Sequence, residues 1–474
     1  MIFQNLLLFI TTFLKENFIS IIVLFSLTLI LVLFFTLHFH KKTKKYLHTL
    51  AFFDEVTNHS NFQKFKLDVE QCLKNNPDKK FSIISFDVDN FKYINNILGY
   101  ERGNNFLRQF ASILHKELSP GAIFCRYDAD IFCIFTRRYE EFEINEKIFK
   151  MNTIQKLLRD ELQFEVTFSL GIYNVDDKNI PVQQMVDYAN IARKSQKGMS
   201  YNNTYSYYTK KMNSSVHLHN HILSTMSRAL KNGDFQLFIQ PKYCATHNRF
   251  YGGEALTRWT TEDTTISPED FITLFEKNGF IKELDKYTFE EVCKFLHDWN
   301  IKYDFPLIIS CNISPLMLQD SNLPYTLHKI TEEYSVPTSQ IEIEITERIM
   351  TKDINSAIII LHRFKSYGFR LSIDDFGAGF NSLNLLKDIP ADIIKLDKEF
   401  LSNLFINSKG KIILSSIIEM AKKLNIEVLA EGVETLEEIE LLKKIDCSLF
   451  QGYYYSKPLS LPEFSKFIQQ KHLL

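Results

Sequence analysis

Apolar runs of very different lengths follow one another along this chain, and the longest lies near the N-terminus. Residues Phe18 to Phe39 contain no Lys, Arg, Asp or Glu and consist mainly of Ile, Leu, Val and Phe. A helix of this length crosses a hydrocarbon layer of about 30 Å, and it lacks the polar stripe of a buried core helix. It exceeds the apolar core of a signal peptide and carries no small-residue cleavage site. The sequence therefore predicts an uncleaved transmembrane helix at about 18–39.

Basic residues are distributed unevenly around this apolar segment. Only Lys15 precedes it, whereas four lysines follow it closely, namely Lys41, Lys42, Lys44 and Lys45. Because Lys and Arg concentrate on the cytoplasmic side of a span, we expect a single pass with everything after it in the cytoplasm. The prediction is a membrane anchor at 1–40 and a linker helix at 41–53. Residues 1–14 are also apolar but too short to span alone.

The next part of the chain alternates short apolar runs with stretches of helical character. The runs typical of strands are Phe81–Phe86, Phe132–Thr136 and Phe164–Ile172. Strands separated by helices indicate an α/β domain with a mixed central sheet, which we place at 54–210. The segment 201–220 is rich in Asn, Ser, Thr and Tyr without a clear period, so it is interpreted as a linker or domain edge. A linker at 211–233 then includes a helix near Ile222–Lys231.

From Phe235 onward the rhythm changes, because eight short apolar strands recur and each carries or precedes a polar residue. They are Phe235–Ile239, Tyr251–Gly253, Leu307–Ser310, Ile341–Ile345, Phe369–Ile373, Ile393–Leu396, Glu427–Leu429 and Leu449–Phe450. Amphipathic helical stretches lie between some of them. Strand and helix repeated this often over about 250 residues indicate a TIM-like (β/α) barrel, which we place at 234–474.

Oxygen-bearing side chains gather at the predicted carboxyl ends of these strands, where barrels of this kind hold their active sites. The residues are Glu254, Asn312, Glu344, Asp374, Asp375 and Glu431. So many carboxylates on one rim would repel one another, so hard divalent cations such as Mg²⁺ or Mn²⁺ are implied. Two such ions suit phosphodiester hydrolysis. Lys395 projects from the same rim, where it would either help to activate a water or form a plain salt bridge.

Composition narrows the class of protein further. The chain has 474 residues, 45% of them hydrophobic and 24% charged, which fits two globular domains in addition to the anchor. A net charge of −2, with no basic stripe or aromatic series, argues against DNA or RNA as partners. The seven cysteines include no Cys-x-x-Cys pair, which argues against a zinc knuckle or a disulfide scaffold and fits a reducing compartment.

A series of motifs in the second half of the chain matches a known family in order and spacing. They are Gln240-Pro241-Lys242, Glu254-Ala255-Leu256, Asn312-Ile313-Ser314, Glu344-Ile345-Thr346-Glu347, the run from Asp374 to Gly379, Lys395-Leu396-Asp397, Glu431-Gly432-Val433-Glu434 and Gln451-Gly452-Tyr453. From about Asp234 to the C-terminus the chain therefore resembles the EAL domain. That family is a barrel phosphodiesterase that opens cyclic di-GMP to linear pGpG.

The resemblance implies roles for individual residues. The metal ligands would be the six oxygen donors named above, two ions being held per site. Glu254, Lys395 and Glu347 would be catalytic, Glu347 by bracing the loop around Asp375. Residues implied to contact the substrate are Gln240, Leu256, Arg258, Asp397, Glu434 and Gln451. The resemblance also implies a homodimer. Together with the anchor, it implies a bacterial inner (cytoplasmic) membrane protein whose catalytic domains lie in the cytoplasm.

Residues from about Ala51 to Lys210 resemble a second family. The run from Phe86 to Asn95 matches the GGDEF domain, a cyclase that makes cyclic di-GMP, but the signature reads Asp128-Ala129-Asp130-Ile131-Phe132. Asp128 puts bulk and negative charge where a glycine would let backbone approach a polyphosphate, and Ile131 replaces an acid. The resemblance therefore implies an inactive cyclase domain with a regulatory or dimerising role. A residual nucleotide or metal site at Asp87, Asn95 and Asp130, with GTP as an allosteric ligand, stays open.

Two functions compete on this sequence. The first is a metal-dependent cyclic di-GMP phosphodiesterase, favoured because no metal ligand implied by the family is substituted. The alternative is a non-catalytic receptor, in which the barrel binds cyclic di-GMP and signals to a protein partner. A bifunctional cyclase and phosphodiesterase is disfavoured by Asp128, Ala129 and Ile131.

Overall fold

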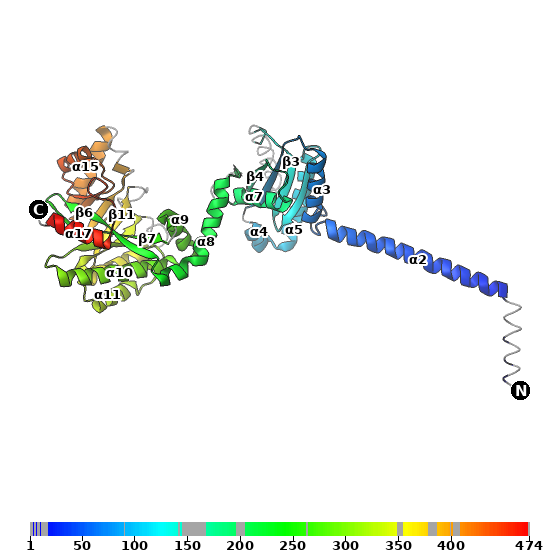
Figure 1. Cartoon of the computed structure of the whole chain (residues 1–474), viewed down its shortest axis with the longest axis horizontal. Helices are drawn as coiled ribbons and strands as arrows, with labels where there is room; N and C mark the ends of the chain where they lie inside the picture. Colours follow the sequence, from blue (N-terminus) through cyan, green and yellow to red (C-terminus); the bar gives the residue numbers. More distant parts are fainter. Residues whose placement is uncertain are drawn as a thin grey trace. The chain divides into compact units, whose positions relative to one another are not determined.

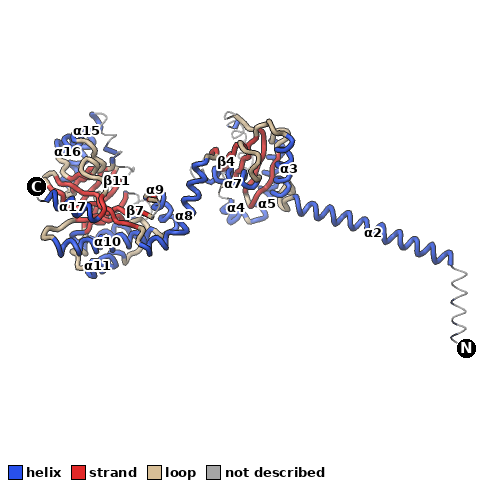
Figure 2. The backbone as a smooth tube through the Cα atoms, in the orientation of Figure 1, coloured by secondary structure: helices blue, strands red, loops and turns tan. Residues whose placement is uncertain are grey.

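The computed structural model describes residues 3, 6, 10, 18–89, 91–140, 143–144, 167–195, 204–261, 264–347, 354–377, 386–398, 400–401 and 408–472. It divides into two compact units, Met1–His217 and Leu218–Leu474, each a combination of helices and a sheet (Figures 1 and 2). The predicted α/β class with an N-terminal apolar helix is confirmed. Each unit is described by itself below.

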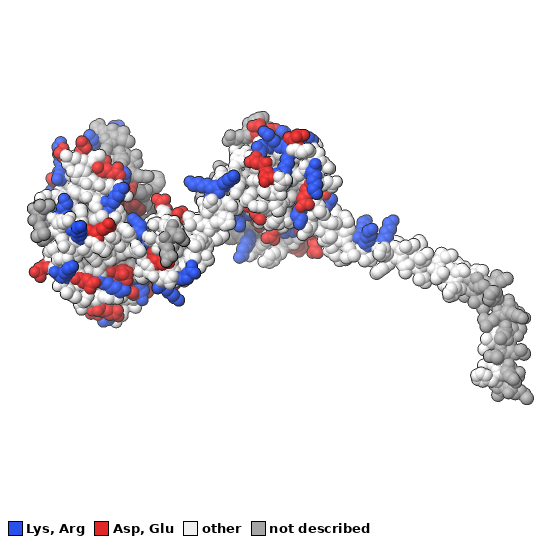
Figure 3. Space-filling view, viewed as in Figure 1, with Lys and Arg blue, Asp and Glu red and all other residues white. Residues whose placement is uncertain are grey.

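Helix α2 (Phe18–Phe52) contains the predicted span and the predicted linker helix as one continuous element. Its stretch Phe25–Phe52 is long and apolar enough to cross a membrane, with a mean hydropathy of 1.2 and no part buried inside the protein. From Phe25 to Phe39 the surface of α2 carries no charged side chain, and lysines follow Phe39 (Figure 3). Large apolar side chains such as Phe25, Phe34 and Phe39 are more than three-fifths exposed. By length and composition, α2 is thus a candidate membrane span.

A five-stranded mixed sheet forms the centre of the first unit, in the order β2-β3-β1-β4-β5. Its strands are β1 (Phe81–Val88), β2 (Ile123–Asp128), β3 (Ile131–Arg137), β4 (Phe168–Val175) and β5 (Thr204–Tyr207). Strand β1 runs antiparallel to β3 and β4, whereas β4 and β5 are parallel. The predicted mixed sheet is therefore confirmed.

Helices cover both faces of this sheet, which explains why every residue of β1 is buried. Helices α4 (Phe91–Leu98) and α5 (Tyr100–Glu117) pack on one face through residues such as Phe110. Helices α3 (Phe62–Asn75) and α7 (Val182–Lys194) pack on the other through residues such as Val69 and Met185.

Two strands of this sheet were not predicted. Strand β5 lies within the segment interpreted as a linker or domain edge, and all four of its residues are only partly buried, so it leaves no apolar run in the sequence. In β2 the charged residues Arg126 and Asp128 interrupt the apolar run, so this strand also leaves no clear apolar pattern in the sequence. Residues 164–166 of the predicted third strand lie outside the described residues, and β4 extends three residues beyond its predicted end.

The second unit is built on a closed barrel of eight strands. They are β6 (Phe235–Cys244), β7 (Arg249–Thr260), β9 (Ile308–Asn312), β10 (Ile341–Thr346), β11 (Arg370–Phe376), β12 (Ile393–Leu396), β13 (Glu427–Ala430) and β14 (Leu449–Gln451). The pairing of β6 with β7 closes the ring. The other barrel strands run parallel, but β6 is antiparallel to both β7 and β14. The predicted barrel is confirmed, with one strand reversed.

Two short strands, β8 (Thr265–Ile266) and β15 (Leu459–Ser460), extend the sheet beyond the ring. The helices of this unit include α8 (Lys210–Asn232), which begins in the first unit, α9 (Pro268–Asn278), α10 (Ile281–Lys302), α11 (Leu323–Glu333), α12 (Ile354–Ser366), α15 (Ser408–Lys423), α16 (Leu436–Lys444) and α17 (Leu461–His472). One large apolar cluster joins several of them to the strands, with Phe289 and Leu361 fully buried in it.

Close approach between strands depends on Gly252 in β7. A Cβ added there would lie 1.7 Å from the carbonyl oxygen of Ile308, which is the residue paired with Gly252 on β9. A glycine is therefore required for β7 to pair with β9 at this point. Because of this pairing, Glu254, which follows Gly252 by two residues on β7, lies near the carboxyl end of β9.

All seven cysteines are free thiols, as expected from their scattered spacing. Cys72 on α3 is partly exposed, and the other six are buried. Burial raises the pKa of Cys293 and of Cys447 to about 12.

Candidate active site

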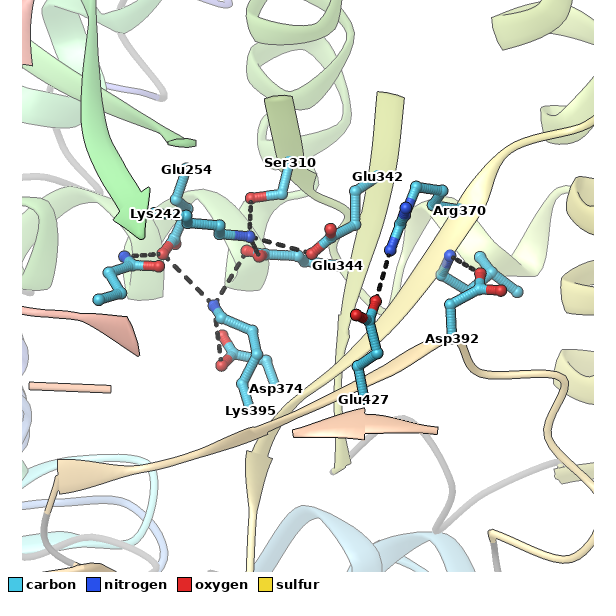
Figure 4. Close-up of polar contacts among 12 residues, drawn as sticks. Lys242, Glu254, Ser310, Glu342, Glu344, Arg370, Asp374, Asp392, Lys395 and Glu427 are labelled. Carbon is cyan, nitrogen blue, oxygen red and sulfur yellow. Dashed lines mark hydrogen bonds and ion pairs between the residues drawn. The ribbon is translucent and has the colours of Figure 1, made fainter. Parts of the chain in front are cut away.

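Seven polar side chains converge at the carboxyl end of the parallel strands of the barrel. In chain order they are Glu254 (β7), Asn312 (β9), Glu344 (β10), Asp374 (β11), Lys395 (β12), Glu431 (after β13) and Gln451 (β14). They meet because the carboxyl ends of parallel barrel strands lie on one rim. Figure 4 shows Glu254, Glu344 and Asp374 pointing toward Lys395.

Lys395 lies at the centre of this group and is 1% exposed. Its Nζ lies 2.7 Å from Glu431 Oε1, 3.1 Å from Asp374 Oδ1, 3.1 Å from Glu344 Oε2 and 3.3 Å from Glu254 Oε2. Four carboxylates therefore face one ammonium group. We call Lys395 and these four acids the carboxylate cluster.

Amide side chains complete the surroundings of Glu254. Asn312 Nδ2 donates to Glu254 Oε1 at 3.0 Å, and Gln451 Nε2 donates to Glu254 Oε2 at 2.7 Å. The same Gln451 nitrogen lies 3.1 Å from Gln240 Oε1 on β6. The reversed strand β6 thus contributes to the rim through Gln240.

The negative charges in the carboxylate cluster are compensated unequally, as the pKa values of its acids show. Burial alone would raise the pKa of Glu344, but the ammonium groups of Lys242 and Lys395 outweigh it and lower that pKa to about 2. Burial, reinforced by Asp374 and Glu254, raises the pKa of Glu431 to about 8 against the opposing effect of Lys395. Burial and the neighbouring Glu344 also raise the pKa of Glu254. One lysine does not neutralise these acids.

The donor set fits hard divalent cations. Carboxylate and amide oxygens are the ligands that Mg²⁺ and Mn²⁺ prefer, and the raised pKa values of Glu254 and Glu431 indicate uncompensated negative charge that such ions would relieve. Among the described residues, no three His, Cys, Asp or Glu side chains are already set in a metal-ligating arrangement. The acids are instead drawn together around Lys395.

Asp375 differs from the other predicted ligands. Its backbone adopts a left-handed conformation with φ of 56°, and β11 loses its regular register with β12 between Ile373 and Phe376. The carboxylate of Asp375 makes no hydrogen bond or ion pair with any residue that the structure describes. A positive φ at a residue other than glycine is strained and often occurs at functional sites.

The loop after Asp375 begins at Gly377, which has a φ of 101°. A Cβ there would lie 2.8 Å from the ring of Phe400, so both backbone conformation and space require glycine. The N–H of Gly377 donates to Glu347 Oε2 at 3.3 Å. Glu347 therefore holds the start of the loop it was predicted to brace. Ala378 and Gly379, the end of the predicted motif, lie outside the described residues.

A cavity of about 370 Å³ opens beside the carboxylate cluster. Five of the six residues predicted to contact a substrate line it, namely Gln240, Leu256, Asp397, Glu434 and Gln451. Tyr453 and Lys398 also line the cavity, and Lys398 Nζ lies 2.6 Å from Glu434 Oε1. The sixth, Arg258, is not among the lining residues. It is half-buried and donates to the carbonyl of Thr257 at 3.1 Å.

A second polar layer lies deeper in the barrel and was not predicted as part of the site. Lys242 on β6 is 1% exposed, and its Nζ lies 2.8 Å from Ser310 Oγ, 3.0 Å from Glu342 Oε1 and 2.9 Å from Glu344 Oε1 (Figure 4). The alternation of Glu342 and Glu344 along β10 is the one signal in the sequence that both acids face the barrel interior.

The three residues of the predicted residual nucleotide or metal site, Asp87, Asn95 and Asp130, lie in the first unit. The carboxylate of Asp87, at the end of β1, is buried and ion-paired with Arg193 of α7, which is 3% exposed. Asn95 Oδ1 is buried and has no hydrogen-bond partner among the described residues. Asp130 is partly buried at the turn between β2 and β3. The structure thus gives Asp87 an arginine as a counter-ion.

The turn that carries Asp130 is held in a conformation that suits glycine. Ala129 has a φ of 42°, and its carbonyl oxygen accepts a hydrogen bond from Arg126 Nε at 2.6 Å. Arg126 also pairs with Asp54 at 3.1 Å. In the motif resemblance, Ala129 stands where the GGDEF signature has its second glycine, so here an alanine adopts the left-handed conformation that a glycine would favour.

Two family models match the chain. The model described as "Diguanylate cyclase, GGDEF domain" matches residues 51–203, and the model described as "EAL domain" matches residues 224–458. Together they match most of both units.

Individual proteins of known name are similar to the chain over most of its length. It is 27% identical over 430 residues to the cyclic di-GMP phosphodiesterase NbdA of Pseudomonas aeruginosa, covering 89% of this chain and 54% of that protein. It is 26% identical over 417 residues to the bifunctional diguanylate cyclase/cyclic di-GMP phosphodiesterase MucR of the same species, covering 86% of this chain and 60% of that protein. The chain therefore spans little more than half the length of these curated relatives.

Among solved structures, the EAL enzyme Bd1971 with cAMP and cyclic di-GMP bound resembles the chain with a TM-score of 0.50 and 27% identity. The likeness covers 72% of this chain and 81% of that one.

Proposed function

Because the chain belongs to the family of proteins that join a GGDEF domain to an EAL domain, we propose that it is a cyclic di-GMP phosphodiesterase. In this proposal the EAL domain hydrolyses cyclic di-GMP to pGpG with the help of two Mg²⁺ or Mn²⁺ ions. The observation that carries it is the carboxylate cluster, in which four acids face a single ammonium beside a cavity of about 370 Å³.

The six predicted oxygen donors, including Asn312 and Asp375, would hold the metal ions. When bound, the ions would supply a water of lowered pKa and would neutralise charge on the reacting phosphate. The side chains themselves provide a fixed, mostly buried frame, in which Gln451 and Asn312 orient both oxygens of Glu254. Such orientation matters because rate depends on placing reacting groups to within a fraction of an ångström.

Lys395 is proposed to bind and orient the attacking water. Its Nζ lies within 3.3 Å of four ligand carboxylates, so it is positioned beside any water that those acids surround. Its pKa is raised well above the usual value because neighbouring acids outweigh burial, so it acts as a donor that holds the water in place.

The cavity residues are proposed to recognise the dinucleotide. Gln240, Leu256, Asp397, Glu434 and Gln451 line a pocket that adjoins the cluster. Amide and carboxylate groups there suit the donors of a guanine edge or a ribose hydroxyl. Arg258 is proposed to contact the substrate from the edge of this pocket, as the family resemblance implies.

The GGDEF-like domain is proposed to be catalytically inactive and to regulate or dimerise the enzyme, with GTP as a candidate allosteric ligand. Asp128 and Ile131 support the loss of cyclase activity, and Arg193 supplies Asp87 with a counter-charge from within the domain. The active form is proposed to be a homodimer.

Helix α2 is proposed to anchor the protein, as a single pass, in the bacterial inner membrane. Its apolar surface and the lysines that follow Phe39 support this topology, with both domains in the cytoplasm.

The test is hydrolysis of cyclic di-GMP by the detergent-solubilised full chain in Mg²⁺ or Mn²⁺. Formation of pGpG that stops in chelator is expected. Glu254→Ala should reduce turnover by about 100-fold or more because it removes a ligand from the cluster. The matched control is Glu440→Ala, which truncates an exposed acid on α16. Binding of cyclic di-GMP without cleavage by the wild type would instead favour a receptor, and equal turnover in Glu254→Ala would remove the cluster as the site.

A further inference from the structure

Lys242 stands apart from the residues already given roles, because it contributes a full positive charge to the barrel interior from the one reversed strand. It is 1% exposed, and it pairs along β6 with Gly252 of β7 and Gln451 of β14. An ammonium group has three N–H donors. Ser310, Glu342 and Glu344 provide three acceptors within 3.0 Å, so the capacity of Lys242 is filled.

Its three partners lie on two adjacent strands in a defined order. Ser310 and Glu342 are directly paired in the register of β9 and β10, and Glu344 lies two residues further along β10. Residues two apart on a strand face the same side, so Glu342 and Glu344 form successive layers inside the barrel. Lys242 bridges these layers, with Glu342 in the deeper one and Glu344 in the layer of the carboxylate cluster.

The two oxygens of Glu344 are used differently. Oε1 accepts from Lys242 at 2.9 Å, whereas Oε2 lies 3.1 Å from Lys395 inside the carboxylate cluster. Glu344 itself is completely buried. A buried carboxylate held at one oxygen by a fixed cation cannot rotate freely, so its other oxygen is aimed at the cluster.

We propose that Lys242 is a positioning residue for Glu344: it fixes one carboxylate oxygen from beneath and presents the other to the divalent cations of the site. The proposal rests on the proposed function for its metals but concerns a residue to which the family comparison assigned no role. Partners that orient a metal ligand through its outer atom typically change metal affinity or activity by about 10- to 100-fold when they are removed.

If Lys242 served only the stability of the barrel, its replacement would have a different effect. Replacing a buried ion pair by apolar side chains of similar size is often neutral for folding, whereas removing one partner strands the other charge. Removal of Lys242 alone would leave Glu342 without its cation and Glu344 with only Lys395, so a loss of activity would not distinguish a positioning role from a structural one. The variant that separates them also changes Glu342, which is buried in the deeper layer and lies outside the carboxylate cluster.

The experiment compares two variants of the full chain. Glu342→Gln keeps Lys242 and its contact with Glu344, and a glutamine oxygen still accepts from the ammonium. The double variant Lys242→Met with Glu342→Gln has the same core charge balance as the wild type but no cation beneath Glu344. Mn²⁺ affinity is measured by calorimetry, folding by circular dichroism and thermal unfolding, and kcat and KM with cyclic di-GMP.

The expected result is that Glu342→Gln binds Mn²⁺ within about threefold of the wild type, while the double variant is folded but binds about 10-fold or more weakly. Its kcat should fall by a similar or larger factor, with KM within about threefold of wild type. Equal Mn²⁺ affinity in the two variants would overturn the proposal, because Lys242 would then serve only the core.

A second route covers the case in which the double variant does not fold. Lys242→Met with Glu342→Met replaces the pair by two apolar side chains of similar length and leaves Glu344 unchanged. If this variant also fails to fold, Lys242 supports the barrel rather than Glu344, and the proposal is overturned. A wild type that binds Mn²⁺ without cleaving cyclic di-GMP would overturn the proposed function but not the Mn²⁺ comparison. Absence of Mn²⁺ binding in the wild type would overturn both.

Discussion

At the scale of single residues, the site depends on how much charge one lysine must balance. Lys395 contacts Glu254, Glu344, Asp374 and Glu431 within 3.3 Å, so any change in its length or charge alters all four acids together. Each of those acids is also a proposed ligand. The lysine is thus placed where it affects the reaction more than the initial binding of a substrate in the adjoining cavity.

Lys395→Met tests this placement. We expect kcat to fall by about 100-fold or more, as for loss of a positioned proton-handling group, while KM changes by less than about threefold. Steady-state kinetics with cyclic di-GMP measure both values. Lys422→Met is the control, because Lys422 is exposed on α15 and pairs with Asp446 away from the cluster. A rise in KM at constant kcat would make Lys395 a substrate anchor instead.

Asp285 on α10 provides a prediction about pH. It accepts a hydrogen bond from the N–H of Ser314 at 2.9 Å, and burial raises its pKa to about 7 in spite of that bond. Between pH 4 and 7 the folded protein therefore binds more protons than the unfolded chain, so this residue makes the free energy of unfolding decrease as pH rises. Above pH 7 its effect is constant.

Asp285→Asn removes this titration and can still accept from Ser314. The variant should gain stability relative to the wild type as pH rises from 4 to 8, by at most about 4 kcal/mol, since one pKa unit corresponds to about 1.4 kcal/mol. Denaturant unfolding at several pH values measures the difference. Asp298→Asn, at an exposed position of the same helix, should show no such trend. A difference that shrinks with rising pH would contradict the assignment.

Residues that end apolar strands could be predicted from sequence, and those that depend on contacts between distant elements could not. Glu254, Glu344 and Asp374 each terminate or follow an apolar run, so parallel strands alone bring them together. The pairing of Arg193 with Asp87 joins residues more than 100 positions apart, and an arginine within an amphipathic helix gives no local sign of its partner.

At the scale of elements, the reversed strand β6 decides which side chains reach the barrel interior. Because β6 is antiparallel to β7 and β14, Gln240 is directed to the rim while Lys242 lies one layer deeper. The apolar run Phe235–Ile239 could be recognised in the sequence, but the direction of the strand in the barrel could not. Side chains alternate with the same period in parallel and antiparallel strands. Short polar strands such as β5 escaped prediction because they bury no continuous apolar face.

The pairing of β7 with β9 can be tested with a pair of glycine variants. Gly252→Ala places a Cβ 1.7 Å from the carbonyl oxygen of Ile308, so the strands must separate. Gly279→Ala meets no atom within 4 Å and suffers only from its φ of 86° at the end of α9. We expect a loss of about 1 kcal/mol for the second, from the cost of a left-handed alanine, and a clearly larger loss or no folding for the first.

Urea unfolding followed by circular dichroism measures both losses. Gly279→Ala is the matched control because it makes the same chemical change in the same unit, at a position where the added Cβ meets no atom within 4 Å. Comparable stability of the two variants would show that β7 and β9 do not approach as closely as their register requires.

At the scale of the whole molecule, the apolar helix α2 is separable from the folded units. The apolar part of α2 is not buried inside the protein, and its large side chains from Phe25 to Phe39 are exposed, so removal of residues 1–40 takes no core residue from the sheet or the barrel. Deletion of residues 1–40 should give a protein that stays in the supernatant without detergent. Its turnover of cyclic di-GMP should remain within about threefold of the full chain in detergent.

Ultracentrifugation and a hydrolysis assay test the deletion. A truncated protein that sediments although it is folded would place a further membrane contact outside α2. Loss of turnover in a soluble, folded truncation would mean that the anchor organises the active form, for instance by holding two chains together.

The burial of the cysteines leaves one thiol accessible for site-specific labelling. Thiolates rather than thiols react with maleimides, and burial both shields six cysteines and raises the pKa of Cys293 and Cys447 to about 12. Cys72 on α3, partly exposed, is therefore expected to take a single fluorophore without any engineered substitution. Such a dye would report on the GGDEF-like domain while the barrel turns over substrate. An effect of GTP on that domain could then be followed optically and separately from the rate of hydrolysis.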